Sequence, residues 1–202
     1  MAIRRPADQA GTRSAILDSA ERLVQHRGFN GFSYADVAAE LGITKAALHY
    51  HFPGKAELGE ALIDRYASRF ADALAEIDTA NVVALERLRA YANLYLGVLR
   101  GERMCLCGML AAEYQTLPDP MRQTVVDFFD HNIAWLTRLL QNGRADKSLK
   151  FTGRPEDTAQ LIVGTLEGAM LVARPYGDTA KFEAVVTRLL SDFGNPATAR
   201  SR

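Results

Sequence analysis

Residues 33–55, with the sequence SYADVAAELGITKAALHYHFPGK, contain two short helix signals separated by a glycine. Ser33 is a typical N-cap and Asp36 follows three residues later, so their side chains can satisfy backbone N–H groups at the start of a helix. Gly42 is expected to end that helix, because glycine adopts the left-handed C′ conformation without steric cost. Thr44 then caps a second helix. Two short helices joined by a glycine-centred turn predict a helix-turn-helix.

The second helix of this motif, which we place over residues 33–52, is expected to have two different faces. Leu48 and Phe52 are four residues apart and should point into a small core. Small side chains on the other face let the helix approach base edges closely, and basic and aromatic side chains can reach bases or phosphates. The pattern therefore predicts an element that enters the DNA major groove, with an ordinary helical hairpin as the alternative. The outward residues are Lys45, Ala47, His49 and Tyr50.

The pattern Ile43-Thr44-Lys45-x-x-Leu48-His49-x-His51-Phe52-x-x-Lys55-x-x-Leu58 resembles the DNA-binding signature of the TetR/AcrR family of bacterial transcriptional repressors. The resemblance covers about residues 12–60, and one departure is His49, where the family usually has Tyr. It implies phosphate contacts from Tyr34, Thr44, His51 and Lys55, and groove contacts from Lys45, Ala47, His49 and Tyr50.

Composition and charge agree with a small DNA-binding region on a larger body. The 202 residues have a formal net charge of zero, but residues 1–55 contain seven Lys or Arg against five Asp or Glu. A hydrophobic content of 48% is sufficient for a core. No apolar run approaches the roughly 18 residues of a membrane span, the N-terminus lacks the apolar core of a signal peptide, and there are only two cysteines. We therefore expect a cytoplasmic protein without a membrane partner.

Nearly the whole chain has helical periodicity, which predicts an all-α fold of about nine helices. Residues 1–11 are expected to form a flexible basic arm with Arg4 and Arg5, or else a featureless tail. Residues 12–54 should form the helix-turn-helix DNA-binding domain, and residues 55–202 a helical domain for ligand binding and dimerisation. Outside residues 33–52, helices are expected over residues 12–27, 55–77, 81–99, 106–117 and 119–140, from Pro155, and over 179–193.

The last two helices are candidates for a dimer interface. One helix-turn-helix contacts too few base pairs to define a site in a genome, and two-fold dimers place two recognition helices one turn of DNA apart. Together with the family resemblance, the apolar faces predict a four-helix bundle between two copies of the chain, with completion of the protomer core as the alternative. The expected interface residues are Ile162, Gly164, Thr165, Gly168, Ala169, Val172, Phe182, Val185, Val186 and Leu189.

The middle helices carry the candidate site for a small-molecule effector, because apolar walls with a few polar groups are typical of such sites. Core packing is the alternative for every aromatic residue and methionine. The candidates are Tyr91, Tyr95, Cys105, Cys107, Met109, Phe128, His131, Trp135 and Met170, with Glu113, Asn132 and Arg174 as further polar groups.

Cys105 and Cys107 are expected to be either small buried hydrophobes or a reactive sensing thiol. Residues two apart on a helix point to nearly opposite sides, which argues against a disulfide between them, and we expect no metal site.

Motifs of enzyme active sites are absent from the sequence: it has no nucleophile elbow, P-loop, H-E-x-x-H or dinucleotide fingerprint. No enzymatic activity and no cofactor are therefore expected. The resulting hypothesis is a homodimeric repressor that binds a palindromic operator in double-stranded DNA and is released by a small-molecule effector. One alternative is a thiol-based electrophile or redox sensor that uses Cys105 and Cys107 on the same fold. The other, of a different class, is a helical binding protein or enzyme whose N-terminal motif is purely structural.

Overall fold

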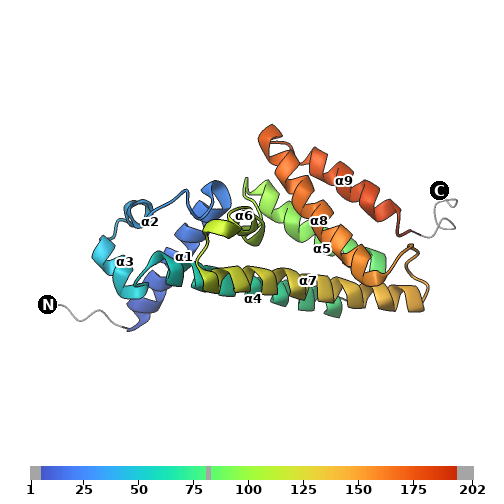
Figure 1. The fold of residues 1–202 in the computed structure, drawn as a ribbon, viewed down its shortest axis with the longest axis horizontal. Coiled ribbons are helices and arrows are strands. Elements are labelled where there is room, and N and C mark those ends of the chain that lie inside the picture. The colour runs from blue at the N-terminus through green and yellow to red at the C-terminus, as the bar shows by residue number, and fades with distance from the viewer. Residues whose placement is uncertain (1–5, 81–82, 195–202) are drawn as a thin grey trace. The chain divides into compact units, whose positions relative to one another are not determined.

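The computed structural model describes residues 6–80 and 83–194, which contain nine α-helices, two 3-10 helices and no strand (Figure 1). The expected all-α fold is therefore confirmed for this part of the chain. None of its helices combines the length and the apolar character that crossing a membrane requires. The elements are α1 (Pro6–Arg27), α2 (Tyr34–Leu41), α3 (Lys45–His51), α4 (Lys55–Thr79), α5 (Ala84–Arg100), α6 (Leu106–Ala112), η1 (Tyr114–Thr116), α7 (Asp119–Ala145), α8 (Pro155–Ala173), η2 (Arg174–Tyr176) and α9 (Ala180–Ser191).

The helix boundaries of the motif follow from local capping chemistry. The Asp36 carboxylate accepts hydrogen bonds from the backbone N–H (2.7 Å) and the hydroxyl (2.6 Å) of Ser33 at the start of α2. Gly42 ends α2 with a φ of 62°, in the left-handed region that favours glycine. The Thr44 hydroxyl oxygen accepts from the Ala47 N–H at 3.1 Å and so caps α3. These caps confirm the predicted helix-turn-helix.

Two compact units make up the chain, and the first contains residues 6–68 and 106–126. It comprises α1 to α3, the first part of α4, α6, η1 and the first part of α7, and α1 packs against both α2 and α6. The DNA-binding domain expected over residues 12–54 is therefore only part of this unit, because α1 and α6 bury apolar residues against each other. The buried side chains of the unit include Ile16, Ala20, Val37, Leu48, Phe52, Leu58, Leu62, Leu106 and Leu110.

The second unit contains residues 69–105 and 127–194. Within it α8 packs against α9, and α5 packs against both. Its fully buried side chains include Tyr91, Leu136, Leu140, Leu166, Met170 and Phe182.

Three expected boundaries differ from the structure by more than two residues. Helix α1 begins at Pro6 rather than at residue 12, because proline suits the first helical position. Arg4 and Arg5 lie outside the described residues. The helix expected over residues 106–117 ends at Ala112, and a 3-10 turn leads to Pro118. Helix α7 continues to Ala145. The expected start of α5 at residue 81 also lies outside the described residues.

Candidate functional site

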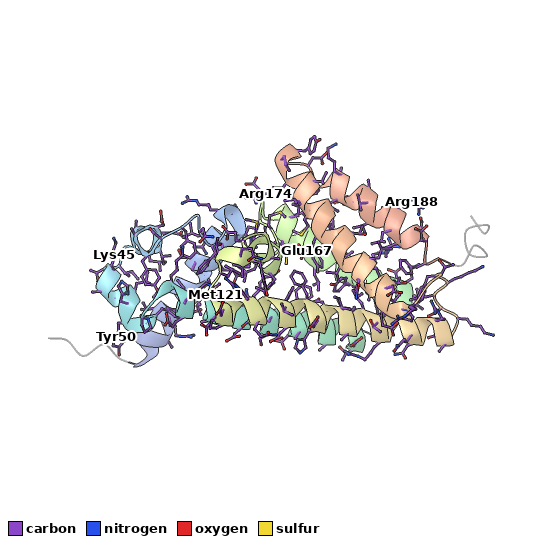
Figure 2. The ribbon with its side chains drawn as sticks, viewed as in Figure 1. Lys45, Tyr50, Met121, Glu167, Arg174 and Arg188 are labelled. Carbon is purple, nitrogen blue, oxygen red and sulfur yellow. The ribbon has the colours of Figure 1, made fainter. Side chains whose placement is uncertain are left out.

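The exposed face of α3 is the candidate DNA interface, and it has the two-sided character that the sequence predicts. Leu48 and Phe52 are buried, whereas Tyr50 is 70% exposed. Lys45 and His49 are also exposed, and Ala47 is half-buried. Lys45 and Tyr50 lie toward the two ends of the helix (Figure 2). The face thus offers a cation, an aromatic hydroxyl and small residues that permit close approach to a groove.

Tyr34 ties the end of α3 to the turn that follows it. Its hydroxyl donates to the backbone carbonyls of Phe52 (3.0 Å) and Gly54 (2.5 Å), and its ring lies 4.8 Å from that of His49. Burial raises the pKa of Tyr34 to about 12, with a smaller contribution from the Glu57 carboxylate. The only hydroxyl hydrogen is shared between these carbonyls, so in this structure Tyr34 holds the turn. The phosphate contact that the resemblance implies for Tyr34 stays a prediction.

The two histidines of α3 differ in their surroundings. His49 Nδ1 lies 3.0 Å from the Pro53 carbonyl oxygen, so this ring nitrogen is engaged by the backbone. The half-buried His51 ring packs edge-on against Tyr50, with ring centroids 5.3 Å apart. These contacts orient both rings before any ligand binds.

Lys55 was expected to clamp a phosphate, but its ammonium group points into the first unit. Nζ donates to the carbonyl oxygens of Phe29 and Phe32 and lies 4.6 and 4.3 Å from the centroids of their rings. Burial lowers the pKa of Lys55, while the carboxylates of Glu113 and Asp36 oppose this effect. Because the carbonyls of the turn between α1 and α2 lack helical partners, Lys55 serves as their donor in this structure, and its phosphate contact stays a prediction.

Glu113 holds the same turn from the other side. Its carboxylate accepts from the backbone N–H groups of Phe29 (2.5 Å) and Asn30 (3.3 Å), and the Asn30 side chain donates to the Thr116 hydroxyl at 2.7 Å. Gly28 has a φ of 82°, and a Cβ atom there would lie 2.6 Å from Glu113 Oε1. Glu113 therefore belongs to the support of the DNA-binding motif rather than to the effector site for which the sequence had suggested it.

In the second unit, four of the expected effector-site residues come together around a buried hydrogen-bond network. The hydroxyls of Tyr91 and Tyr95 are 3.0 Å apart, and Tyr91 donates to Asn132 Oδ1 at 3.2 Å. Trp135 stacks on Tyr91 with centroids 5.5 Å apart, and Phe128 completes the aromatic wall. The sequence did not identify Phe70, whose ring contacts those of Tyr91, Tyr95 and Phe128.

The other expected effector-site residues are distributed differently. Met170 and Cys105 are buried in the second unit, whereas Cys107 and Met109 belong to the first unit. His131 is exposed, and its Nδ1 lies 2.6 Å from the Asp127 carbonyl oxygen. His131 is therefore not part of the aromatic cluster.

Glu167 on α8 is a polar group of this region that the sequence analysis missed. Its Oε1 atom is buried and has no hydrogen-bond partner in the described part of the chain. Burial raises the pKa of Glu167 to about 7, and a hydrogen bond from the Cys105 side chain opposes this effect. The sequence did contain a signal for this group, because an acidic residue on an otherwise apolar helix face, close to Leu166 and Met170, indicates a buried carboxyl group.

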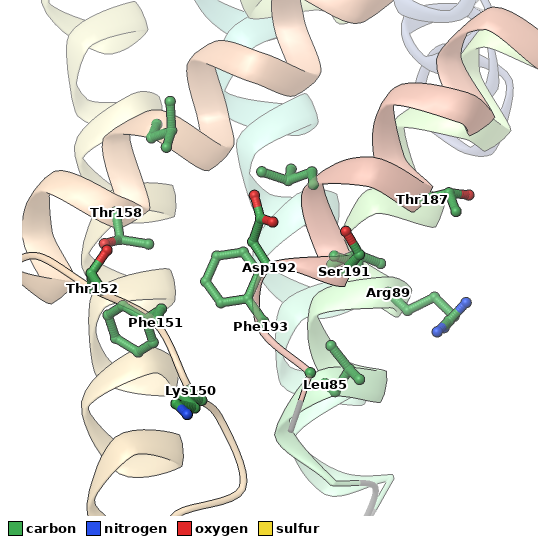
Figure 3. A pocket seen from close by; sticks show the side chains of 14 residues that line it. Leu85, Arg89, Lys150, Phe151, Thr152, Thr158, Thr187, Ser191, Asp192 and Phe193 are labelled. Atoms are coloured by element: carbon green, nitrogen blue, oxygen red, sulfur yellow. The ribbon is translucent and has the colours of Figure 1, made fainter. Parts of the chain in front are cut away.

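A cavity of about 970 Å³ lies elsewhere in the second unit (Figure 3). Its walls come from the start of α5, the segment 150–152, the start of α8 and the end of α9, and include Phe151 and Phe193. None of the residues expected to bind an effector lines it, so it does not coincide with the aromatic cluster.

The expected dimer-interface residues divide between the surface and the core of the protomer. Val172 and Val185 are 62% and 36% exposed, and Cβ atoms added at Gly164 and Gly168 would meet nothing within 4 Å. Leu161 and Leu171 on α8 are also more than half exposed. Thr165, Val186 and Leu189 are half-buried. Ile162, Ala169 and Phe182 are buried and complete the protomer core instead, because α8 packs on α9 and α5 within the chain.

Comparison with known proteins gives one family over both halves of the chain. A family model described as bacterial regulatory proteins, tetR family, matches residues 16–62, and a tetracyclin repressor-like C-terminal domain matches residues 84–189. The crystal structure of a TetR family transcriptional regulator from Agrobacterium tumefaciens is 33% identical with a TM-score of 0.89, over 93% of this chain and 100% of that chain.

A second similar protein is the HTH-type transcriptional repressor NemR of Escherichia coli (strain K12). It is 26% identical over 193 residues, which are 92% of this chain and 96% of that protein. The crystal structure of E. coli NemR in its reduced form is 27% identical with a TM-score of 0.79, over 92% of this chain and 99% of that chain.

Proposed function

This chain belongs to the TetR family of bacterial regulatory proteins, and we propose that it is a homodimeric repressor released from a palindromic operator by a small-molecule effector. Members of the family are DNA-binding transcriptional regulators and not enzymes, so the alternative of an enzyme with a structural N-terminal motif is set aside. The similarity to a protein named as a transcriptional repressor supports repression rather than activation.

The observation that carries the proposal is the exposed face of α3. A capped, seven-residue helix presents Lys45, His49 and Tyr50 to solvent, while the contacts of Tyr34, Lys55 and Glu113 with the backbone hold its surroundings. Donors on a rigid helix are the means by which helix-turn-helix proteins contact base edges.

The exposed apolar side chains of α8 support a homodimer. One side of α8 carries exposed residues that follow one another at intervals of three, four, three and one positions. They are Leu161, Gly164, Gly168, Leu171 and Val172. Exposed contiguous apolar surface on a soluble protein marks an interaction site, and the glycines allow close approach of a second helix. Val185 on α9 extends this surface.

The aromatic cluster of the second unit supports the effector site. It joins an apolar wall to convergent hydroxyl, amide and carboxyl groups, the combination that orients small ligands. An effector releases the operator only if it binds the DNA-free form more tightly than the DNA-bound form.

A thiol sensor is the second candidate, and the observation that favours it is the likeness to E. coli NemR, one structure of which is described as the reduced form. The hydrogen bond between Cys105 and Glu167 does not favour it, because a neighbouring carboxylate stabilises the thiol rather than the thiolate. Both cysteines are at most 1% exposed, which disfavours rapid reaction with an electrophile. The Cys105→Ser variant distinguishes the candidates: operator release by an electrophile should disappear only if the thiol is the sensor.

The proposal is tested by measuring binding to a DNA fragment from beside the protein's own gene. Fluorescence anisotropy should give a Kd at least about 10³-fold lower for this fragment than for a scrambled one, with a steep salt dependence. Light scattering should give the mass of two chains. Equal binding to both fragments, or a monomer at micromolar concentration, would refute the proposal.

A further inference from the structure

Glu167 places a carboxyl group on the apolar side of α8. Its neighbours four residues before and three residues after, Val163 and Met170, are buried core residues. Oε1 of Glu167 is buried and has no hydrogen-bond partner within residues 6–80 and 83–194. Since buried polar groups in folded proteins are nearly always paired, an acceptor of this kind points to a donor from outside the chain.

The groups around Glu167 all belong to the second unit. The Cys105 side chain is hydrogen-bonded to its carboxyl group, and the carboxylate acts electrostatically on the hydroxyls of both Tyr91 and Tyr95. No lysine or arginine of the described part of the chain neutralises it. The carboxyl group therefore lies beside aromatic residues without a cation of its own.

We infer that Glu167 anchors the effector, and that the effector is a protonated amine attached to an apolar or aromatic body. This inference rests on the proposed function for the existence of an effector, and it adds the effector's chemical class. A protonated amine supplies the donor that Oε1 lacks, and a charge-assisted hydrogen bond is stronger than a neutral one.

The same arrangement disfavours two other classes of ligand. A carboxylate ligand would be repelled by the ionised form of Glu167, because like charges destabilise each other in a site of low dielectric constant. A hydrocarbon without a donor would leave Oε1 unpaired.

The test compares three probes that share one ring and differ in charge: 2-phenylethylamine, 2-phenylethanol and phenylacetate. Trp135 is the only tryptophan of the chain and stacks on Tyr91, so its fluorescence in the full-length protein reports binding. At about pH 8, above the pKa of Glu167, the amine should bind at least about tenfold more tightly than the alcohol, a difference of about 1.4 kcal/mol, and the acid should bind most weakly. Equal affinities, or no response to the amine at millimolar concentration, would overturn the inference.

Glu167→Gln should bring the amine to the affinity of the alcohol, because the amide keeps the shape of the side chain but lacks the charge. Glu167→Asp retains the charge and should keep part of the preference. Glu156→Gln is the matched control, since it removes from the same helix a carboxylate that is already paired with Gln141 and Arg154, and it should leave all three affinities unchanged. A Glu167→Gln protein that folds, as circular dichroism shows, and retains the preference for the amine would show that Glu167 has only a structural role.

The probe titrations need no DNA, so their outcome is separate from that of the proposed function. Amine binding through Glu167 in a protein that binds no operator would support the site and refute the repressor. Specific operator binding with no preference for the amine probe would refute the inference about Glu167 but would still support the proposed repressor function.

Discussion

The two compact units hold their functional groups by different means. In the first, polar side chains bind the backbone: Tyr34, Lys55 and Glu113 each pair with carbonyl or amide groups of turns beside the motif. In the second, Tyr91 and Tyr95 bind each other, and Glu167 keeps an unpaired oxygen. A backbone held at many points presents a fixed shape to DNA, whereas a side-chain network with an unsatisfied member can rearrange around a ligand.

The largest expected effect comes from matched cavities in the two units. Leu48→Ala and Leu166→Ala each remove a fully buried leucine, and each should reduce the free energy of unfolding by about 2–5 kcal/mol. Urea denaturation measures this loss. Under conditions where both variants remain folded, Leu48→Ala should weaken operator binding more than Leu166→Ala, because Leu48 lies on α3 and its buried side chain fixes the position of that helix. Equal effects of the two variants on DNA binding would contradict the assignment of DNA binding to the first unit.

Glu113→Ala tests whether backbone contacts hold the first unit. It leaves the amides of Phe29 and Asn30 without their acceptor and should cost about 1–3 kcal/mol of stability. Hydrogen exchange at these two amides should accelerate. Thr116→Val is the control, since it removes two exposed hydrogen bonds of the Thr116 hydroxyl, from the Asn30 side chain and to the Glu113 carbonyl, but leaves the Glu113 carboxylate in place, and it should have a smaller effect. Unchanged protection of both amides in Glu113→Ala would count against this role of the carboxylate.

Substitutions at the α3 surface should separate DNA contacts from support. Lys45→Ala and Tyr50→Ala should each weaken operator binding by about 1–3 kcal/mol and relax the preference among operators, with little change in thermal stability.

Lys55→Met provides the contrast to these two variants, because it removes the donor to Phe29 and Phe32 and should lower stability. It should leave the salt dependence of DNA binding unchanged, whereas loss of a phosphate clamp would reduce the slope by about 1. A reduced slope of affinity against salt concentration would instead support the phosphate contact that the family pattern predicts for Lys55.

The smallest expected effect is at the α8 surface. A Cβ atom at Gly168 meets nothing in the protomer, so Gly168→Ala should stabilise the isolated helix by about 1 kcal/mol while weakening the dimer by crowding its interface. Gly97→Ala on α5 is the matched control, because its Cβ also meets nothing and it lies outside the expected interface. Analytical ultracentrifugation should show weaker dimerisation for Gly168→Ala alone. Unchanged dimerisation would indicate a different interface.

The sequence predicted those features that depend on neighbours a few residues apart. The left-handed Gly42, the cap at Thr44 and the burial of Leu48 and Phe52 all follow from intervals of four residues or fewer. Tyr91, Tyr95 and Trp135 were identified by residue type, but their stacking and shared hydrogen bonds were not.

Long-range contacts account for the partners that the sequence did not predict. Lys55 has the position of a phosphate clamp in the family pattern, yet its partners are 26 and 23 residues earlier in the chain. Glu113 binds an amide 84 residues away. No local pattern reports such pairs, because each depends on which turn the packed helices bring within hydrogen-bond distance.

The sequence by itself determined the helices, their caps, the two-sided character of α3 and the family resemblance, since these depend on propensities and spacings along one segment. Only the tertiary structure decided which polar groups are already paired. Lys55 is engaged by backbone carbonyls and Glu167 retains an unpaired oxygen because burial and partnership are properties of the packed helices, and the free energy of a polar group depends on both.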